Sequence, residues 1–127
     1  MRVFLFQDRF AGKVRDGSKP HTIRKTARCK PGDVLSLRRW TGKPYRSKQE
    51  VLRETVCTAV HAVTIFPFDV TVDGWRVPGQ HLAVKDGFRD WEEMREWFER
   101  THGLPFRGFV IEWANAQHHA EAGRPIA

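Results

Sequence analysis

The sequence predicts a single α+β domain of mostly antiparallel strands with few helices, and three observations support this class. Short runs of apolar and β-branched residues alternate with turn residues along most of the chain, as in a sheet whose strands are joined by tight turns. A segment that starts near Asp90 has the apolar spacing of an amphipathic helix. The length of 127 residues suits one domain, because it allows a sizeable core and leaves little room for a second.

The first forty residues are expected to form three strands and one short helix. Residues 9–16 make about two helical turns, since Phe10 and Val14 lie four residues apart on one face and Gly17 can end the helix. Pro20 excludes a helix just before the next extended segment. The predicted strands cover residues 3–6, 21–24 and 34–40, the last of them after the Pro31-Gly32-Asp33 turn.

The middle of the chain is expected to hold a loop, a long strand and a hairpin. Residues 41–50 are polar and basic, which indicates a mobile loop and the best place for variable function. Residues 54–65 are rich in β-formers and predict a long strand with both faces partly covered. The Asp73-Gly74 pair between two apolar runs of residues 70–77 predicts a hairpin with a two-residue turn.

The helix that starts near Asp90 has the clearest signals at its ends. Asp90 can cap it, with Glu93 three residues later as in a capping box, and Gly103 can end it as a left-handed residue. Its apolar stripe is expected to pack in the core rather than to stack on bases, and consists of Trp91, Met94, Trp97 and Phe98. A last strand follows at residues 106–113, so the predicted domain covers residues 1–113, and residues 114–127 are a tail without a core pattern.

The charge of the chain is unevenly distributed. Residues 1–50 contain fourteen Lys and Arg against four Asp and Glu, whereas residues 51–127 contain eight against eleven. Such an asymmetry indicates an anionic partner, and nucleic acid is favoured over a membrane because no basic amphipathic helix accompanies the charge. The alternative is a basic surface that contacts only solvent.

The two cysteines, Cys29 and Cys57, occur in a sequence with no secretory signal and no long apolar run. This combination favours a reduced, cytoplasmic protein with free thiols. Neither cysteine has the neighbours that a zinc site or a catalytic dyad needs, and His118-His119 lacks further ligands. No metal or phosphate-binding glycine loop is therefore expected.

One segment, residues 17–24 with the sequence GSKPHTIR, places an amine, a hydroxyl and a guanidinium within a few residues. A lysine whose pKa is lowered by burial can act as a base, and a threonine hydroxyl needs such a base to become a nucleophile. Lys19 and Thr22 fit these roles, and Asp86 in the sequence Asp86-Gly87-Phe88 can supply a carboxylate if the fold brings it near.

These motifs resemble, in their order along the chain, the ASCH domain family, which has the PUA-like fold. The resemblance covers residues 6–113, nearly the whole chain. It implies a PUA-like β-barrel of mixed, mostly antiparallel strands with flanking helices. Besides the two segments above, it depends on Phe6-Gln7-Asp8-Arg9-Phe10, Pro31-Gly32-Asp33-Val34-Leu35 and Val110-Ile111-Glu112-Trp113.

Some ASCH proteins similar to this one are amidohydrolases that remove the acyl group from N4-acylated cytidine. The resemblance implies Lys19 as proton acceptor, Thr22 as nucleophile and Asp86 as proton donor. The expected reaction converts N4-acetylcytidine to cytidine without a metal or an organic cofactor. The pocket that the resemblance implies is lined by Phe6 or Phe10, Lys19, Thr22, Arg24 and Asp86, with the Arg24 fork on a carbonyl oxygen or on Asp86.

Asp86 departs from the hydrolase pattern, in which this position is a glutamate. Aspartate is one methylene shorter, and the placement of an acid matters for catalysis. The Asp-Gly-Phe form is common in the wider family, whose members are mostly interpreted as RNA binders. A non-catalytic RNA-binding module and an RNA-cleaving ASCH enzyme therefore remain as alternatives.

Each residue of the set also has an ordinary structural explanation. Thr22 suits any strand, Lys19 suits a solvated basic segment, and Asp86 can cap or brace a turn. His21 is expected to be a strand histidine rather than a base. The occurrence of the whole set in the family's order is what favours a shared site.

A second candidate site is a cluster of aromatic and basic residues around the predicted loop. Aromatic side chains among cations suit stacking on bases while the charges hold phosphate. The alternative is an exposed loop with one tryptophan at the end of a strand. An enzyme for free nucleosides has no need of this cluster, whereas an RNA reader or nuclease depends on it. Its members are Arg38, Arg39, Trp40, Lys43, Tyr45 and Lys48.

Overall fold

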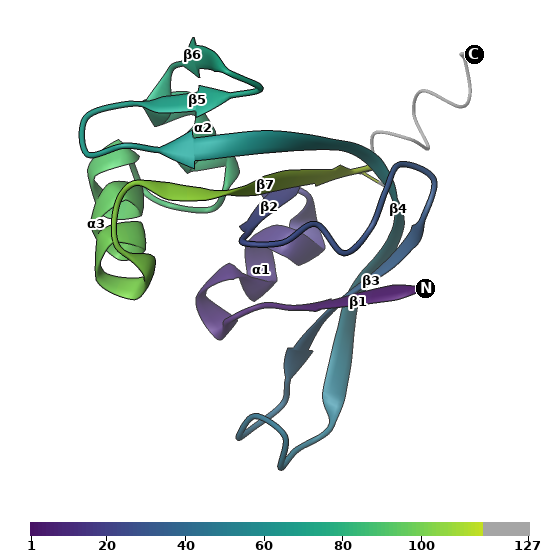
Figure 1. Ribbon diagram of the computed structural model, residues 1–127. Coiled ribbons are helices and arrows are strands. Elements are labelled where there is room, and N and C mark those ends of the chain that lie inside the picture. Colours follow the sequence, from purple (N-terminus) through teal and green to yellow (C-terminus); the bar gives the residue numbers. More distant parts are fainter. Residues whose placement is uncertain (116–127) are drawn as a thin grey trace.

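The computed structural model describes residues 1–115, which form seven strands and three helices (Figure 1). The α+β class predicted from the sequence is confirmed. In chain order the elements are β1 (Arg2–Leu5), α1 (Asp8–Asp16), β2 (His21–Arg24), β3 (Val34–Trp40), β4 (Gln49–Ile65), β5 (Val70–Val72), β6 (Trp75–Val77), α2 (Gly79–Lys85), α3 (Trp91–His102) and β7 (Phe106–Trp113).

The long strand β4 organises the sheet. Its first half pairs with β3, from Trp40 opposite Gln49 to Val34 opposite Val56. Its second half pairs with β7 on one side and with β5 on the other, and β5 pairs with β6. β2 adds to the outer edge of β7, and β1 runs parallel to β3, while every other pair is antiparallel. The sheet is therefore mixed and mostly antiparallel, as predicted.

The strands do not close into a barrel among the described residues. The two strands that would have to pair, β1 and β2, share no strand ladder. A side chain links them instead, because the Nη2 group of Arg24 on β2 donates to the Leu5 carbonyl of β1 over 2.8 Å. Arg24 thus lies where a closed barrel would have backbone pairing, and its guanidinium holds the two ends of the sheet together.

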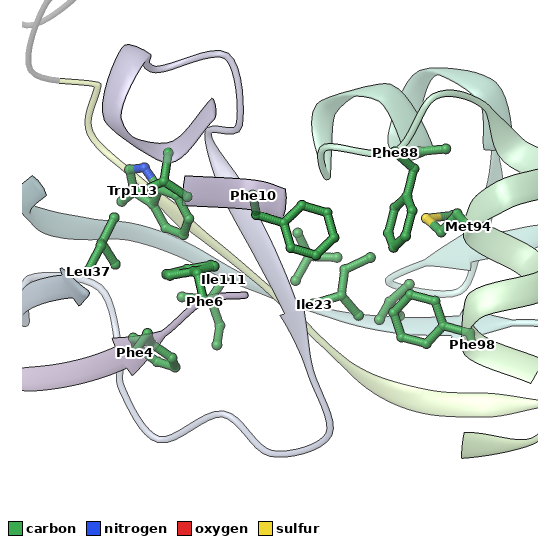
Figure 2. Close-up of a cluster of buried hydrophobic side chains, with 14 of the residues drawn as sticks. Phe4, Phe6, Phe10, Ile23, Leu37, Phe88, Met94, Phe98, Ile111 and Trp113 are labelled. Atoms are coloured by element: carbon green, nitrogen blue, oxygen red, sulfur yellow. The ribbon is translucent and has the colours of Figure 1, made fainter. Parts of the chain in front are cut away.

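One hydrophobic core extends through the described residues (Figure 2). Figure 2 shows Phe10 and Ile23 between two groups of side chains. Phe4, Phe6, Leu37 and Trp113 lie on the side of β1 and β3, and Phe88, Met94 and Phe98 lie on the side of α3. Phe10 comes from α1 and Ile23 from β2, so these two elements lie at the centre of the core that the sheet and α3 enclose.

Several elements follow the local signals of the sequence closely. Gly17 adopts the left-handed conformation that ends α1, with φ of 88°. Asp73 and Gly74 both have positive φ, which matches the turn predicted for the β5–β6 hairpin. The Asp90 side chain accepts from the Glu93 backbone N–H over 2.9 Å, so the predicted cap of α3 is confirmed.

Two predicted features differ from the structure, and one helix was not predicted. Gln49 and Glu50 belong to β4, so the loop predicted for residues 41–50 ends at residue 48; Gln49 is exposed and Glu50 is half-buried, and polar side chains suit such strand positions. Helix α2 was not predicted, because it starts at Gly79 after Pro78 and has no side-chain cap. Gly103 ends α3 with φ of 81° but an extended ψ of 158°, so it is not a left-handed helical cap.

The first residues after β7 continue to contact the sheet. Ala114 donates its N–H to Val56 over 3.0 Å, and the Asn115 side chain donates to the Gly17 carbonyl over 3.0 Å. The rest of the predicted tail, including His118 and His119, lies outside the described residues. Within residues 1–115, no helix has the length and apolar composition needed to cross a membrane.

Candidate functional site

The residues predicted from the first half of the chain and from Asp86-Gly87-Phe88 meet at one cavity. Lys19 comes from the turn after α1, Thr22 and Arg24 from β2, and Asp86 from the residue that ends α2. All four line a cavity of about 290 Å³, a size that fits a small organic molecule. The other lining residues are Leu5, Phe6, Gln7, Phe10, Ile23, Lys25, Phe88, Trp97, Phe98 and His102.

Lys19 and Asp86 form a buried ion pair at the wall of this cavity. Nζ of Lys19 donates to Oδ1 of Asp86 over 2.8 Å and to the Asp86 backbone carbonyl over 2.6 Å. Lys19 is 2 % exposed and Asp86 is 4 % exposed. Lys19 is therefore not the solvated charge that its basic segment would suggest, and its burial is sustained by the partner that the fold supplies.

Burial moves the two pKa values toward each other. The cost of burying a charge lowers the pKa of Lys19, while the nearby Asp86 carboxylate opposes this change. The same cost raises the pKa of Asp86 against the attraction of Lys19 and Arg24. Each shift makes the neutral form of its group less costly, and the neutral forms are those in which lysine acts as a base and aspartate as an acid.

Thr22 and Arg24 lie next to each other on β2 and share a hydrogen bond. Nε of Arg24 donates to Oγ1 of Thr22 over 3.2 Å, so the hydroxyl proton of Thr22 remains available for a base. The contact between Lys19 and Thr22 that the resemblance implies is not among the hydrogen bonds of the described residues. A bridging water, or a rotation of Lys19 away from Asp86, would allow a proton to pass between them.

Aromatic rings hold the two cations of the site in place. The Lys19 ammonium lies 4.9 Å from the ring centre of Phe10 and 5.8 Å from that of Phe6. The Arg24 guanidinium lies 5.0 Å from the centre of the same Phe6 ring and 5.3 Å from that of Phe4. Phe6 therefore contacts both cations, and both predicted aromatic residues, Phe6 and Phe10, belong to the cavity.

The backbone conformation and the close contacts of residue 87 require a glycine after Asp86. The φ of 97° at Gly87 is in the region that favours glycine, and a Cβ atom at this position would meet Cδ1 of Phe10 at 2.8 Å. The Gly87 carbonyl also accepts from Nζ of Lys13 over 2.9 Å. The turn thus brings the backbone against α1, which places Asp86 beside Lys19.

His21 lies in β2, as the sequence predicted, but its contact with Asp86 was not anticipated. Its Nε2 atom lies 3.4 Å from Oδ1 of Asp86 and has no hydrogen bond of good geometry among the described residues. Burial, with Lys19 and Lys85 nearby, lowers the pKa of His21 to about 3, so the imidazole is neutral at ordinary pH. No local signal could have found this contact, because Asp86 is distant in the sequence.

A second cavity of about 300 Å³ is lined in part by His21. Its walls are mostly apolar and come from α2, the β5–β6 hairpin and the ends of β2 and β7. His81, Lys85 and Glu112 add polar groups. None of the predicted catalytic residues lines this cavity. His21 lines it and also contacts Asp86, which lines the first cavity.

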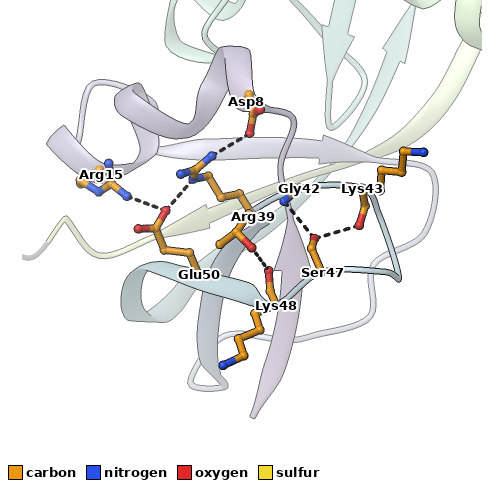
Figure 3. Close-up of polar contacts among 9 residues, drawn as sticks. Asp8, Arg15, Arg39, Gly42, Lys43, Ser47, Lys48 and Glu50 are labelled. Atoms are coloured by element: carbon orange, nitrogen blue, oxygen red, sulfur yellow. Dashed lines mark hydrogen bonds and ion pairs between the residues drawn. The ribbon is translucent and has the colours of Figure 1, made fainter.

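The residues predicted to contact nucleic acid lie on the β3–β4 hairpin but differ in their availability. Arg39 is engaged in ion pairs with Glu50 at 2.5 Å and with Asp8 at 3.1 Å (Figure 3). Arg38 donates to Ser36 over 2.8 Å and to the Gln49 side chain over 3.0 Å. Both arginines therefore have partners that brace the hairpin.

The tip of the hairpin presents the remaining members of the cluster. The Trp40 and Tyr45 rings lie 5.1 Å apart, and Tyr45 is 86 % exposed. Figure 3 shows the ammonium groups of Lys43 and Lys48 pointing away from the hydrogen bonds that order the turn. These bonds join Ser47 to Gly42 and Lys43, and Thr41 to Lys48. The tip is thus an ordered turn that carries the Lys43 and Lys48 ammonium groups beside an aromatic pair.

Within residues 1–115, His, Cys, Asp and Glu side chains form no group of three that could hold a metal ion.

Compared with models of known protein families, with curated proteins and with solved structures, the chain gives no match.

Proposed function

We propose that this protein is an amidohydrolase that removes the acyl group from N4-acylated cytosine nucleosides, with N4-acetylcytidine as the type substrate. The buried pair of Lys19 and Asp86 at the wall of a small cavity is the observation that carries this proposal. An amine and a carboxyl with opposite pKa shifts supply a base and an acid within one site. Thr22 on the same cavity supplies the nucleophile.

In the first half of the reaction, the amide bond is exchanged for an ester. Neutral Lys19 takes the hydroxyl proton of Thr22 through a bridging water, so that Lys19 stays beside Asp86, and Oγ1 attacks the acyl carbonyl carbon. The bond between this carbon and N4 then breaks, and Asp86 gives its proton to the leaving N4 amine. Because Nζ of Lys19 and Oδ1 of Asp86 are 2.8 Å apart, the proton on Lys19 can return to Asp86 directly.

In the second half, water hydrolyses the acyl-threonine ester. Lys19 again accepts a proton, this time from the attacking water, and Thr22 regains its hydroxyl proton as the carboxylic acid leaves. Arg24 donates to Oγ1 of Thr22 and is fixed by Leu5, so its guanidinium is positioned to stabilise the charge that develops on the oxygens around Thr22. No step requires a metal or an organic cofactor.

The proposed function comes with a proposed fold family. We infer an ASCH domain of the PUA-like class, because the site residues occur in the order of that family and come together at one cavity. The side-chain link from Arg24 to Leu5 stands where the barrel of that class would close. A cytoplasmic location and a modified cytosine nucleoside as substrate belong to the same proposal.

The decisive experiment is incubation of the purified chain with N4-acetylcytidine, followed by chromatographic detection of cytidine. We expect cytidine and acetate in equal amounts, and none from a Thr22→Val protein, which keeps the β-branched shape without the hydroxyl. N4-propionyl and N4-benzoyl cytidine test how large an acyl group the cavity accepts. A chain that releases no cytidine from any of the three would exclude the hydrolase.

A non-catalytic RNA-binding module is the second candidate function, and the hairpin tip is the observation that favours it. Trp40 and Tyr45 can stack on bases of a single strand, while Lys43 and Lys48 can contact phosphates. The same cavity would then hold an unstacked base. Binding of a single-stranded RNA without release of cytidine would support this candidate, and cleavage of that RNA would support an RNA-cleaving ASCH enzyme.

A further inference from the structure

The two cysteines of the chain are neighbours in the structure. Sγ of Cys29 lies 3.9 Å from Sγ of Cys57, and both residues are free thiols. Cys29 belongs to the segment of residues 25–33 that follows β2 and is half-buried, whereas Cys57 on β4 is 1 % exposed. An S–S bond is about 2.05 Å long, so a movement of about 2 Å would join the two sulfur atoms.

The backbone around the two thiols keeps them together. Gly32 donates its N–H to the Cys57 carbonyl over 2.8 Å, and the Cys57 N–H donates to the Asp33 carbonyl over 2.8 Å. The pairing of β4 with β7 also changes register just after Cys57. The end of the segment is therefore attached to β4 at the residue that carries the buried thiol, and Cys29 lies only a few residues before this attachment.

We propose that Cys29 and Cys57 form a redox modification site that closes to an intramolecular disulfide on reaction with hydrogen peroxide. In the first step the Cys29 thiolate attacks the peroxide oxygen, the O–O bond breaks, and Cys29 becomes a sulfenic acid while hydroxide leaves. In the second step Cys57 sulfur attacks the Cys29 sulfur, and water leaves with the Cys57 proton. The two thiols lose two electrons, and one peroxide becomes two waters.

The different environments of the two thiols determine the order of these steps. Cys29 is the more accessible thiol, so it meets the oxidant first. Burial and the neighbouring Cys29 raise the pKa of Cys57 to about 11, so Cys57 stays protonated and unreactive toward peroxide at neutral pH. Once Cys29 is a sulfenic acid, Cys57 is the nearest thiol and resolves it.

The disulfide would restrict the motion of residues 25–33, which follow the candidate active-site residue Arg24 in the chain. Residues 25–33 start directly after Arg24, and Lys25 lines the cavity that Thr22 and Arg24 also line. A covalent bond from Cys29 to β4 would restrict this segment. We therefore expect slower amide hydrogen exchange in residues 25–33 after oxidation, with little change in α3, which lies on the other side of the cavity.

The test uses the full chain, treated with hydrogen peroxide and analysed by intact mass, thiol counting under denaturing conditions and peptide mapping. We expect a monomer that has lost two hydrogen atoms and both free thiols, a peptide in which Cys29 is joined to Cys57, and full reversal by dithiothreitol. Addition of oxygen at Cys29 with Cys57 still free would overturn the proposal, and so would a dimer joined through Cys29.

Two single variants separate the roles of the thiols. In Cys29→Ser, Cys57 should remain reduced at a peroxide concentration that fully oxidises the natural chain. In Cys57→Ser, Cys29 should stop at oxygen adducts and form no internal disulfide. If Cys57→Ser does not fold because the residue is buried, Cys29→Ser and the natural chain still decide the proposal. A Cys57 that oxidises as fast in Cys29→Ser as in the natural chain would overturn it.

Discussion

Nζ of Lys19 lies 2.8 Å from Oδ1 of Asp86, although 67 residues separate them in the chain. Lys19 follows the end of α1 and Asp86 ends α2, so the contact depends on how these two helices pack against the sheet. Because both groups are buried, each is the main partner that makes the burial of the other tolerable. The same burial lowers the pKa of Lys19 and raises the pKa of Asp86, while the attraction between the two groups opposes both shifts.

Removing the hydroxyl of Thr22 should abolish deacylation. Thr22→Val keeps the strand shape and removes the nucleophile, so cytidine release should fall by at least about a thousandfold, as is typical of losing an attacking group. Thr22→Ser keeps the hydroxyl and should retain measurable turnover. Product release is measured by chromatography, and the midpoint of thermal unfolding shows whether each variant is folded. Undiminished turnover by Thr22→Val would exclude the covalent mechanism.

Replacing Asp86 should separate binding from turnover. Asp86→Asn keeps the hydrogen-bonding shape but cannot donate an acidic proton, so it should bind cytidine with unchanged affinity and lose turnover. Asp86→Glu restores the side chain of the hydrolases that the sequence resembles and should remain active. Affinity is measured by calorimetry and turnover by cytidine release. Full activity in Asp86→Asn would remove this residue from the mechanism.

The neutral state of His21 predicts a pH dependence of stability. The pKa of His21 is about 3 in the folded chain against an ordinary value of 6.5. Between these values the unfolded chain binds a proton that the folded chain excludes, so this histidine lowers the free energy of unfolding as the pH falls. The loss is about 1.4 kcal/mol for each pH unit below 6.5.

His21→Gln removes this proton and places an amide where Nε2 faces Asp86. Denaturant unfolding between pH 7 and pH 4 should therefore show a smaller loss of stability for His21→Gln than for the natural chain. His81→Gln, at an exposed position of α2, is the matched control and should behave like the natural chain. Identical pH dependence of His21→Gln and the natural chain would show that the imidazole is not held neutral.

Gly87 and Gly74 allow the cost of a steric clash to be separated from the cost of backbone strain. Both have positive φ, but a Cβ atom would contact Phe10 at 2.8 Å only at Gly87 and has open space at Gly74. Gly74→Ala should cost about 1 kcal/mol of stability from backbone strain alone. Gly87→Ala should cost about 1–3 kcal/mol more because Phe10 must move. Chemical denaturation of the two variants measures the difference, and equal losses would mean that the cavity wall yields without cost.

If the hairpin tip contacts RNA, its two lysines should account for a part of the salt dependence of binding. Each neutralised phosphate of a single strand contributes about 0.7 to the slope of log affinity against log salt concentration. Lys43→Ala with Lys48→Ala should therefore lower the slope by about 1.4. Arg39→Ala is a poor probe, because it also breaks ion pairs with Glu50 and Asp8. An unchanged slope in the double variant would exclude the tip as an RNA contact.

Elements with local signals could be predicted from the sequence. Gly17 ends a helix, Asp73-Gly74 makes a hairpin turn, and Asp90 caps α3, because these residues act on their own backbone or on that of residues nearby. Helix α2 lacks such local signals and was therefore not predicted. No side chain caps it, and it begins at Gly79, which has low helix propensity.

For the candidate site, too, the sequence predicted some properties and the tertiary structure decided the others. The order of its residues along the chain nominated Lys19, Thr22, Arg24 and Asp86, but their burial and partners could not be derived from that order. The tertiary structure alone decided that Lys19 is paired, that His21 faces Asp86, and that Cys29 lies beside its fellow cysteine on β4. Contacts across tens of residues depend on strand register and helix packing, which are set by the burial of the whole apolar core rather than by any one segment.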